Sequence, residues 1–308
     1  MRATRHNGRS GKHGVYNPKH NDRKFDIANS EHIDAEREKQ NIYWDCYRGY
    51  VQNPSDETLR NWGPVEPEAS FHNIEKMYYE DHYSDFIKGQ NARNEKNRHP
   101  ERNRTTEDLL KNKMTCPEET IFQIGKEGEH ISGEQLFHIA DTFMKRFEGM
   151  FGEHVHILDF ALHMDETTPH IHERHVFDCE NKYGELCPQQ EKALESLGIP
   201  LPDPDKPRGR NNNRKMTFDL ICRNLLFDVC RQYGLEIEEA PEYGGKKYLE
   251  KQEFIIQAQK EKIARQEQMI KEQEEKIMDN ETLIDEVSEI AYDKAVEVVT
   301  EKVKAQTQ

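Results

Sequence analysis

The pattern of hydrophobic positions predicts both strands and helices between residues 2 and 240. Residues 155–162 and 120–125 are runs of aliphatic and aromatic side chains, which favour strands. Residues 132–150 instead place their apolar side chains on one face of a helix, and Ser132 at its start is a typical N-cap. The order strand, helix, strand, strand, helix predicts an α+β domain whose sheet is largely antiparallel.

Further elements are expected on both sides of this segment. Residues 2–7 predict an edge strand, residues 71–87 predict a helix, and another helix is expected to begin at its cap Thr217. Residues 34–50 predict one more helix, whose aromatic stripe either packs in the core or stacks on unpaired nucleic-acid bases; the core interpretation is the commoner one for such stripes. Residues 53–115 read as a variable, insertion-like region.

A different pattern starts after residue 245. Isoleucines recur every seven residues, at positions 256, 263, 270, 277 and 284, which is the register of a coiled coil. We therefore expect residues 1–245 to form one domain and residues 246–308 to form a long coiled-coil helix that self-associates, giving a homo-oligomer. The alternative is a solvated amphipathic helix that packs on its own domain.

Composition limits the class of protein. Hydrophobic residues make up 34% of the chain and charged residues 33%, so part of the chain is expected to lie outside a globular core. No apolar run is long enough for a membrane segment, and the polar residues from Arg2 onward do not form a hydrophobic leader. The six cysteines show no CxxC pair or zinc-finger spacing, so we expect reduced thiols in a cytoplasmic protein.

The net charge of −15 argues against a nucleic-acid partner, but the distribution of charge weakens this argument. Residues 1–23, 93–113 and 206–215 are each locally basic, and such local patches determine how a surface meets phosphates. The middle stretch is either an arm that grips a strand or a solvated loop, and the sequence leaves both open. The candidate phosphate-contacting residues come from the other two stretches: Arg2, Arg5, Arg9, Lys12, Lys19, Arg208, Arg210, Arg214 and Lys215.

The clearest chemistry lies in the segment His163–His172, which reads His-Met-Asp-Glu-Thr-Thr-Pro-His-Ile-His. His170 and His172 are two residues apart, so both rings project from one face of a strand. His163 ends the preceding strand, and the Thr-Thr-Pro sequence forms the connection. Three imidazoles that converge from adjacent strands, with one side open, are typical of a catalytic metal site; the alternative is a hydrogen-bonded histidine cluster without a metal. By the same count, His175 faces away from this group.

Two motifs carry a family resemblance. The segment His163–His172 (HxDExxPHxH) and the earlier segment Lys19–Phe25 (KHNDRKF) resemble, in this order, the Mob/Pre plasmid mobilisation and recombination proteins, the V family of conjugative relaxases. That family belongs to the HUH endonucleases, named for two histidines separated by a hydrophobic residue, here His170-Ile171-His172. The resemblance covers residues 2–240 and implies an HUH-type antiparallel sheet flanked by helices.

The resemblance implies a metal-dependent DNA strand transferase. Such an enzyme nicks one strand at a single-stranded or hairpin transfer origin, stays joined to the 5′ phosphate and later rejoins the ends. Family analogy makes His163, His170 and His172 the ligands of Mn²⁺ or Mg²⁺. Glu166 is a possible additional ligand, and Asp165 is expected to orient an imidazole. A set of imidazoles alone would also suit zinc or nickel.

The nucleophile implied by the resemblance is His20, because the Mob/Pre family resembles a relaxase variant in which histidine replaces tyrosine. Asn21 and Arg23 complete the matching motif, and Arg23 is expected to steady the phosphate. His6 opens a second His-Asn-x-Arg sequence but lacks the flanking lysine and phenylalanine. We therefore favour His20, with tyrosines as weaker candidates: Tyr16 and Tyr43.

Two other classes of protein remain open. One is a non-catalytic coiled-coil DNA-binding protein whose histidines are structural. The other is a metal-dependent phosphodiesterase that uses water and forms no covalent link. A covalent protein–DNA adduct separates the relaxase from both.

Overall fold

The computed structural model describes residues 1–12, 14–23, 33, 34, 36–50, 70–126 and 128–238, together with the single residues 268, 271, 273 and 294. The chain divides into two compact units, Met1–Glu242 and Tyr243–Gln308. All elements that the structure describes lie in the first unit. The predicted boundary at residue 245 lies outside the described residues, as does the predicted coiled coil apart from the four single positions, so both stay predictions.

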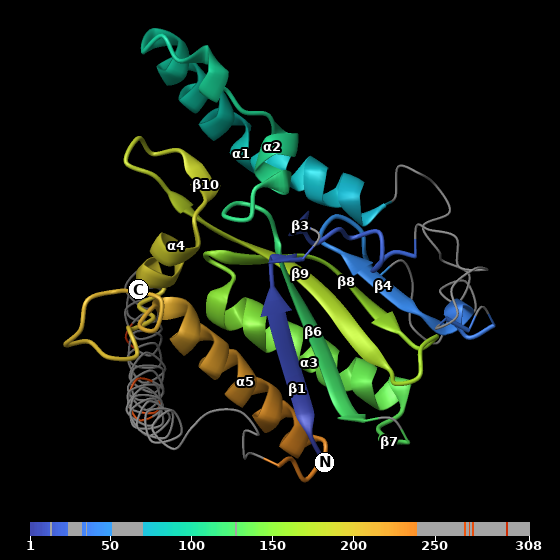
Figure 1. Cartoon of the computed structure of the whole chain (residues 1–308). Coiled ribbons are helices and arrows are strands. Elements are labelled where there is room, and N and C mark those ends of the chain that lie inside the picture. Colours follow the sequence, from blue (N-terminus) through green and yellow to red (C-terminus); the bar gives the residue numbers. More distant parts are fainter. Residues whose placement is uncertain are drawn as a thin grey trace, which may run out of the picture. The chain divides into compact units, whose positions relative to one another are not determined.

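One antiparallel sheet organises the first unit (Figure 1). Its main strands follow the order β1-β6-β9-β8-β4-β5, while β7 pairs with β6, β10 pairs with β9, and β2 and β3 form a separate hairpin. The strands are β1 (Ala3–Gly8), β2 (Ser10–Gly11), β3 (Gly14–Val15), β4 (Ile42–Asp45), β5 (Gly49–Tyr50), β6 (Glu118–Lys126), β7 (Glu129–His130), β8 (Val155–His163), β9 (His170–Glu180) and β10 (Leu186–Pro188). The predicted α+β class with a largely antiparallel sheet is therefore confirmed.

Helices cover both faces of this sheet. The bounds are α1 (Phe71–Lys96), α2 (Thr106–Lys111), α3 (Gly133–Phe151), α4 (Gln190–Ser196) and α5 (Arg214–Gln232), with short 3-10 turns η2 (Glu38–Gln40) and η5 (Pro100–Arg102). Helices α3 and α5 bury their apolar side chains against one face in the main hydrophobic cluster. Tyrosines of α1 and leucines of α2 form a second cluster with Leu158 and Val176. Within the described residues, no helix combines the length and apolarity needed to cross a membrane.

Strand β9 shows how the two faces differ. Its residues alternate between the faces, and ten of its eleven positions are buried. Arg174 contacts Glu75 of α1 on one side. His175 lies on the other side, where its ring contacts Phe147 of α3 and Phe218 of α5. His175 thus faces away from the candidate metal site, as the count along the strand predicts.

The helix predicted over residues 34–50 is wrong, because this segment forms the hairpin β4–β5. Ile42, Tyr43 and Trp44 are consecutive β-branched and aromatic residues, which favour a strand over a helix. Gly49 has a φ of 67°, a left-handed conformation that suits the hairpin turn. Part of the aromatic stripe does pack in the core, since Tyr43 is buried and Trp44 stacks on Phe160 of β8, whereas Tyr47 is exposed.

Helix boundaries were predicted with mixed success. Ser132 caps α3 as expected, and its hydroxyl accepts a hydrogen bond from the backbone of Gln135. Helix α5 begins earlier than predicted, because Asn213 is its cap and Thr217 lies buried inside the helix. Both asparagine and threonine are good caps, so pattern alone did not separate them. The predicted strands 2–7, 120–125 and 155–162 are confirmed with small changes of boundary.

A buried carboxylate joins the sheet to α5. Glu118 of β6 lies 2.6 Å from the ammonium group of Lys215 in α5, and it accepts a hydrogen bond from Asn7 of β1. Burial alone would raise the pKa of Glu118, but the charges of Lys215, His175 and Arg9 outweigh burial and lower the pKa to about 2. The ionised form therefore stabilises the folded state.

We predict that Glu118→Gln lowers the free energy of unfolding by about 2–3 kcal/mol at neutral pH, because the cations around it lose their partner. The folded-state pKa lies below the ordinary value of 4.5, so this stabilisation is present above that value and is lost as the pH falls toward 2. Denaturant unfolding over a pH series should show the difference between variant and wild type shrinking on acidification. Parallel curves would contradict this role.

Candidate metal centre and active site

Three histidines meet at the end of the β8–β9 hairpin. His163 of β8 is paired directly with His170 of β9, and His172 lies two residues further along β9. The ring centroids are 5.3 Å apart for His163 and His170, and 5.0 Å apart for the other two pairs. The three side chains are buried. The hairpin therefore brings together the three imidazoles that the sequence singled out.

Hydrogen bonds on the outer side of the rings fix which nitrogen faces inward. His170 Nδ1 lies 2.9 Å from the carbonyl oxygen of Thr168, and His163 Nε2 lies 2.9 Å from that of Asn21. His172 Nδ1 lies 3.0 Å from the Glu119 carboxylate. These oxygens only accept hydrogen bonds, so each outer nitrogen carries the ring proton. The inner nitrogens, His163 Nδ1, His170 Nε2 and His172 Nε2, therefore present lone pairs.

The donor set fits a divalent cation. The inner nitrogens of His170 and His172 are only 3.2 Å apart, and the inner nitrogen of His163 is buried without a hydrogen-bond partner in the described part of the chain. Burial lowers the pKa of His163 and of His170, which keeps both rings neutral. Two ligand atoms bound to one octahedral ion at about 2.1 Å and at a right angle lie about 3 Å apart, which matches the observed spacing.

Glu166 adds a carboxylate to this group. Its oxygens lie 3.9 Å from His163 Nδ1 and 3.8 Å from His170 Nε2. The ligand atoms of His163, Glu166 and His170 all lie within 4.8 Å of one another, as do those of His20, His163 and His172. The candidate ligands therefore fall into two overlapping groups that share His163.

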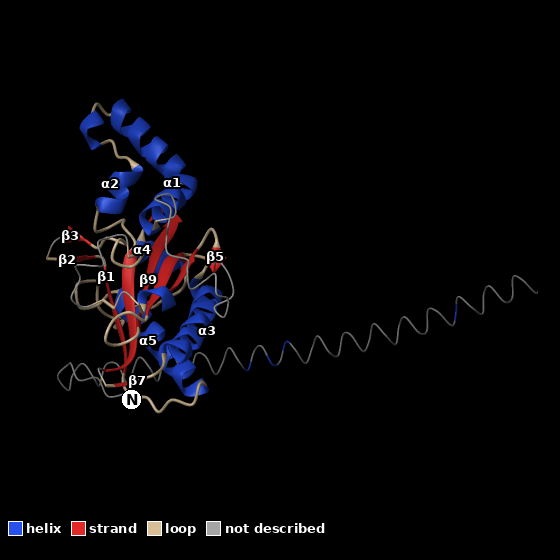
Figure 2. Ribbon diagram, turned by 90° about the vertical axis from the view of Figure 1, so that its right-hand side faces the viewer, coloured by secondary structure: helices blue, strands red, loops and turns tan. Residues whose placement is uncertain are grey.

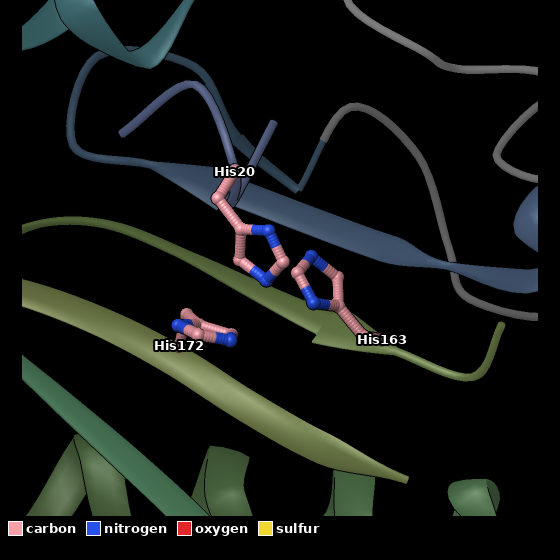
Figure 3. A group of neighbouring side chains, drawn as sticks. All are labelled: His20, His163 and His172. Carbon is pink, nitrogen blue, oxygen red and sulfur yellow. The ribbon is translucent and has the colours of Figure 1, made fainter. Parts of the chain in front are cut away.

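His20 lies beside this cluster, 143 residues before His163 in the sequence (Figure 3). Its ring centroid is 5.6 Å from that of His163 and 5.1 Å from that of His172, and half of its side chain is exposed. Burial, aided by the nearby His172 and Arg23, lowers the pKa of His20 to about 4. The imidazole is therefore neutral near pH 7, and a neutral imidazole carries a lone pair that can act as a nucleophile.

Arg23 fixes the His20 loop onto the hairpin. Its guanidinium donates two hydrogen bonds to Asp165, at 2.9 and 2.6 Å, and one to Glu166 at 2.8 Å. Another nitrogen of the same group lies 3.4 Å from His20 Nε2. Arg23 has a φ of 55°, an unusual conformation for a residue other than glycine, and the buried Asp165 contact holds it there.

Asp165 has different partners from those expected. Among the described residues, its carboxylate accepts hydrogen bonds from Arg23 and from Asn41, and not from an imidazole. The expectation that Asp165 orients an imidazole is therefore corrected. The carboxylate of Glu119 has that place instead, on His172.

Sequence reasoning missed Glu119 and Asn41. Glu119 precedes the predicted strand 120–125, and its charge gave no sign that the side chain reaches His172 on another strand. Asn41 donates to Asp165 and accepts from the backbone of Met164, so it fastens β4 to the hairpin turn. Each acts through a partner more than fifty residues away in the chain, which a local motif does not reveal.

The weaker nucleophile candidates differ in exposure. Tyr43 is 2% exposed, and burial raises its pKa well above the usual range, so its hydroxyl is neither accessible nor easily ionised. Tyr16 is 40% exposed and its ring lies against Gly8 and Gly11 of the β2–β3 region. Of the two histidines considered as nucleophiles, His20 and His6, His20 is the one whose ring nitrogen lies close to those of His163 and His172.

The predicted phosphate-contacting residues fall into two groups. Several are engaged by acids inside the fold: Arg5 with Asp219, Arg9 and Lys215 with Glu118, and Arg214 with Glu191 and Glu195. Only 3% of the Arg5 side chain is exposed, which leaves no surface for a phosphate. The others are exposed: Arg2, Lys12, Lys19, Arg208 and Arg210. Arg208 and Arg210 belong to the loop between α4 and α5, far from the metal hairpin (Figure 1).

A cleft of about 490 Å³ opens beside the histidines. Its walls combine the imidazoles with small polar side chains of the hairpin turn and of β6. The lining residues are His20, Ile121, Gln123, Glu166, Thr167, Thr168, His170 and His172. His20, His170 and His172 therefore border a space that a substrate can enter, whereas His163 lies buried behind it.

No family model matches this sequence, and no curated protein matches it either. Two similar solved structures are Mn-bound crystal structures of the MobM relaxase domain (MOBV; Mob_Pre) bound to plasmid pMV158 oriT DNA. The similar structures are relaxase domains. Their identities to this chain are 18% and 16%, their TM-scores 0.43 and 0.44, and the matches cover 80% of this chain and 95% of each neighbour. At such low values, function has to be argued from the residues of the site.

We predict that Glu119→Gln weakens Mn²⁺ binding by about 10- to 100-fold, because an uncharged amide oxygen holds the His172 ring, with its inner nitrogen toward the site, more weakly than the carboxylate does. Calorimetric titration of Mn²⁺ into the purified protein measures this without any DNA. The neighbouring variant Glu118→Gln is the matched control, since Glu118 faces α5. It should lose stability and keep its Mn²⁺ affinity. Equal affinities of Glu119→Gln and wild type would contradict the orienting role.

Proposed function

We propose that this protein is a metal-dependent DNA relaxase of the Mob/Pre type. It nicks one strand of a transfer origin, holds the 5′ phosphate on a histidine and later rejoins the strand. The observation that carries this proposal is the half-exposed, neutral His20 beside three buried imidazoles whose inner nitrogens converge. A structural histidine cluster would satisfy both nitrogens of each ring, but here His163 Nδ1 is buried without a hydrogen-bond partner among the described residues.

The residues that would hold Mn²⁺ or Mg²⁺ are His163, His170 and His172, with Glu166 as the additional ligand. Such an ion, when bound, supplies positive charge that binds phosphate oxygens and stabilises the charge that develops on them. The similar MobM structures are Mn-bound, which supports this choice. Their bound oriT DNA supports the substrate class.

His20 would act as the nucleophile. A lone pair of its neutral ring forms a bond to the phosphorus, and the bond from phosphorus to the 3′ oxygen breaks, leaving a 3′ hydroxyl once that oxygen gains a proton. The ring becomes positively charged as the new bond forms. Glu166, whose carboxylate lies 3.7 Å from His20 Nε2, is placed to stabilise this charge. Attack by a 3′ hydroxyl on the same phosphorus reverses the reaction and rejoins the strand.

Asn21 and Arg23 would position these groups. The backbone oxygen of Asn21 accepts a hydrogen bond from His163, and its side-chain amide donates to Glu119 at 3.3 Å, so this residue links the His20 loop to His163 directly and to His172 through Glu119. Arg23 holds the same loop on Asp165 and lies beside His20. The proposed catalytic role of Asn21 is therefore one of alignment.

The remaining parts of the proposal concern the whole chain. Residues 1–245 would form the relaxase domain, and residues 246–308 a coiled coil through which the cytoplasmic protein forms homo-oligomers. DNA would enter the cleft beside His20, with the exposed Arg2, Lys12 and Lys19 as phosphate contacts near the amino terminus.

We predict that His20→Ala abolishes covalent joining to DNA, reducing adduct by at least about a thousandfold, because no other described side chain combines its exposure with its place at the cluster. Labelled single strands that tile the DNA around the gene, incubated with Mn²⁺ and run on a denaturing gel, reveal the adduct. His6→Ala is the control, since His6 opens the second His-Asn-x-Arg sequence and lies on the edge strand β1. It should form adduct like wild type.

Other outcomes assign the other classes. Cleavage by the wild type without an adduct would indicate a phosphodiesterase that uses water. Binding that needs no metal, with no cleavage of any strand, would indicate a non-catalytic DNA-binding protein. An adduct that persists in His20→Ala would place the nucleophile elsewhere.

A further inference from the structure

A projecting hairpin of helices is the largest feature that the proposed active site does not use. It comprises residues 84–108, from the middle of α1 through η5 to the first turn of α2, and we call it the arm. Figure 2 shows it extending away from the sheet. None of its residues is buried, whereas α1 before residue 84 and α2 after residue 108 are both anchored in the core. The arm therefore adds little to the hydrophobic core.

Specific contacts nevertheless hold the arm in one position. Arg93 makes two hydrogen bonds of 2.6 Å to Glu185, next to strand β10, and its guanidinium lies 4.0 Å from the centroid of the Tyr183 ring. Gly89 permits this contact, because a Cβ at that position would lie 1.9 Å from a Glu185 oxygen. A bidentate pair of this kind fixes orientation as well as distance. The β9–β10 turn thus braces the arm.

The returning chain of the arm is fastened to α1 by amides. Asn91 donates to the backbone oxygen of Arg104 and accepts from its backbone nitrogen, both at 2.9 Å. Asn103 donates to Glu95 at 2.7 Å. An exposed segment with so many fixed contacts is built to present its tip.

The tip of the arm is basic in an acidic protein. We define the tip as residues 95–104. It contains four basic residues, Lys96, Arg98, Arg102 and Arg104, and two acidic residues, Glu95 and Glu101. Among the ion pairs of the described residues, Arg102 lies 3.8 Å from Glu101, and Lys96, Arg98 and Arg104 have no carboxylate within 4.0 Å. Lys96 also suits the negative end of the α1 dipole, but the arginines lie beyond the helix.

Arg98 occupies a position where glycine is usual. It follows the C-cap Asn97 with a φ of 60°, and it is one of only two described non-glycine residues with positive φ; the other is Arg23 in the active site. A side chain in this conformation costs about 1 kcal/mol or more, so a glycine would be easier to accommodate. The arginine side chain at this exposed corner therefore has a use other than folding.

We propose that the tip of the arm binds the phosphate backbone of duplex DNA that flanks the nicked strand. The base of the arm is tied to the active site, because Asp22 accepts a hydrogen bond from the first backbone nitrogen of α1 and Glu75 pairs with Arg174. Helix α1 has 26 residues and is therefore about 39 Å long, which is the axial length of roughly eleven base pairs of duplex DNA. This inference rests on the proposed function.

The shaft of α1 supports contact at the tip alone. Its exposed acids Glu80, Asp81 and Asp85 outnumber Lys76 and Lys88, which pair with Glu80 and Asp85, so the middle of the helix offers phosphates no net positive charge. A duplex that starts near the active site would therefore meet favourable charge only at the tip. Short duplexes would not reach it.

The test compares two DNA probes of mixed sequence, without metal, over a range of salt concentrations. Both carry the same single-stranded extension; one has a duplex of about fourteen base pairs and the other of about five. The tip variant combines Lys96→Gln, Arg98→Asn and Arg102→Gln. The control variant removes equal charge from α3 and α5, on the opposite face of the sheet, by Lys145→Gln, Arg146→Gln and Arg231→Gln.

We expect wild type and control to bind the long duplex about tenfold more tightly than the short one, and the tip variant to bind both alike. Loss of three phosphate contacts should flatten the salt dependence, so that wild type loses about 40-fold more affinity than the tip variant between 50 and 200 mM salt on the long probe. Equal binding of both probes by wild type, or an unchanged salt slope in the tip variant, would overturn the inference. So would a loss of salt slope in the control as large as in the tip variant.

Failure of the proposed function gives a different result. If the proposed function is wrong, no covalent adduct that requires Mn²⁺ and His20 will form, whether or not DNA affinity depends on duplex length. The tip variant retains all residues of the proposed active site. A change confined to duplex binding is therefore assigned to the arm and not to the active site.

Discussion

The ion pair between Arg23 and Asp165 holds the proposed active site together. It joins two segments 142 residues apart, and both side chains are almost completely buried. Burying such a pair costs desolvation free energy, and removing either partner leaves an uncompensated charge. Its main effect is therefore positional: it fixes His20 against the β8–β9 hairpin. Without it, the three hairpin histidines would stay together on β8 and β9, but His20 would not be held beside them.

A second constraint comes from the alternation of β6. Glu118 and Glu119 are adjacent and face opposite sides of the sheet, and the pKa of each is lowered to about 2, because neighbouring cations and hydrogen bonds outweigh the effect of burial. One carboxylate ties α5 to the sheet, and the other orients His172. Arg174 connects the latter to Glu75 at the base of α1. Glu119, which orients His172, is thus connected through Arg174 and Glu75 to the helix from which the arm extends.

Local patterns predicted what local geometry determines. Two histidines at a spacing of two, after a turn, had to share a strand face, so the hairpin cluster could be predicted from sequence. His20 required the resemblance to a family, since no local pattern relates it to residues 143 positions away. The error at residues 34–50 arose because an aromatic stripe is compatible with a helix as well as a strand, and partners on β8 decided the outcome. Glu119 and Asn41 have meaning only through such distant partners.

The net charge of −15 was the strongest argument against DNA, and the structure shows why it misleads. The acids nearest the site have partners within the fold: Asp165 and Glu166 share Arg23, and Glu119 pairs with Arg174 and accepts a hydrogen bond from His172. A phosphate approaching His20 therefore meets imidazoles and carboxylates that are already paired with arginines, rather than free carboxylates. Because screening leaves charges beyond about 10 Å with little influence at physiological salt, the distant acids do not oppose binding. The local balance of charge, and not the total, decides whether this site accepts DNA.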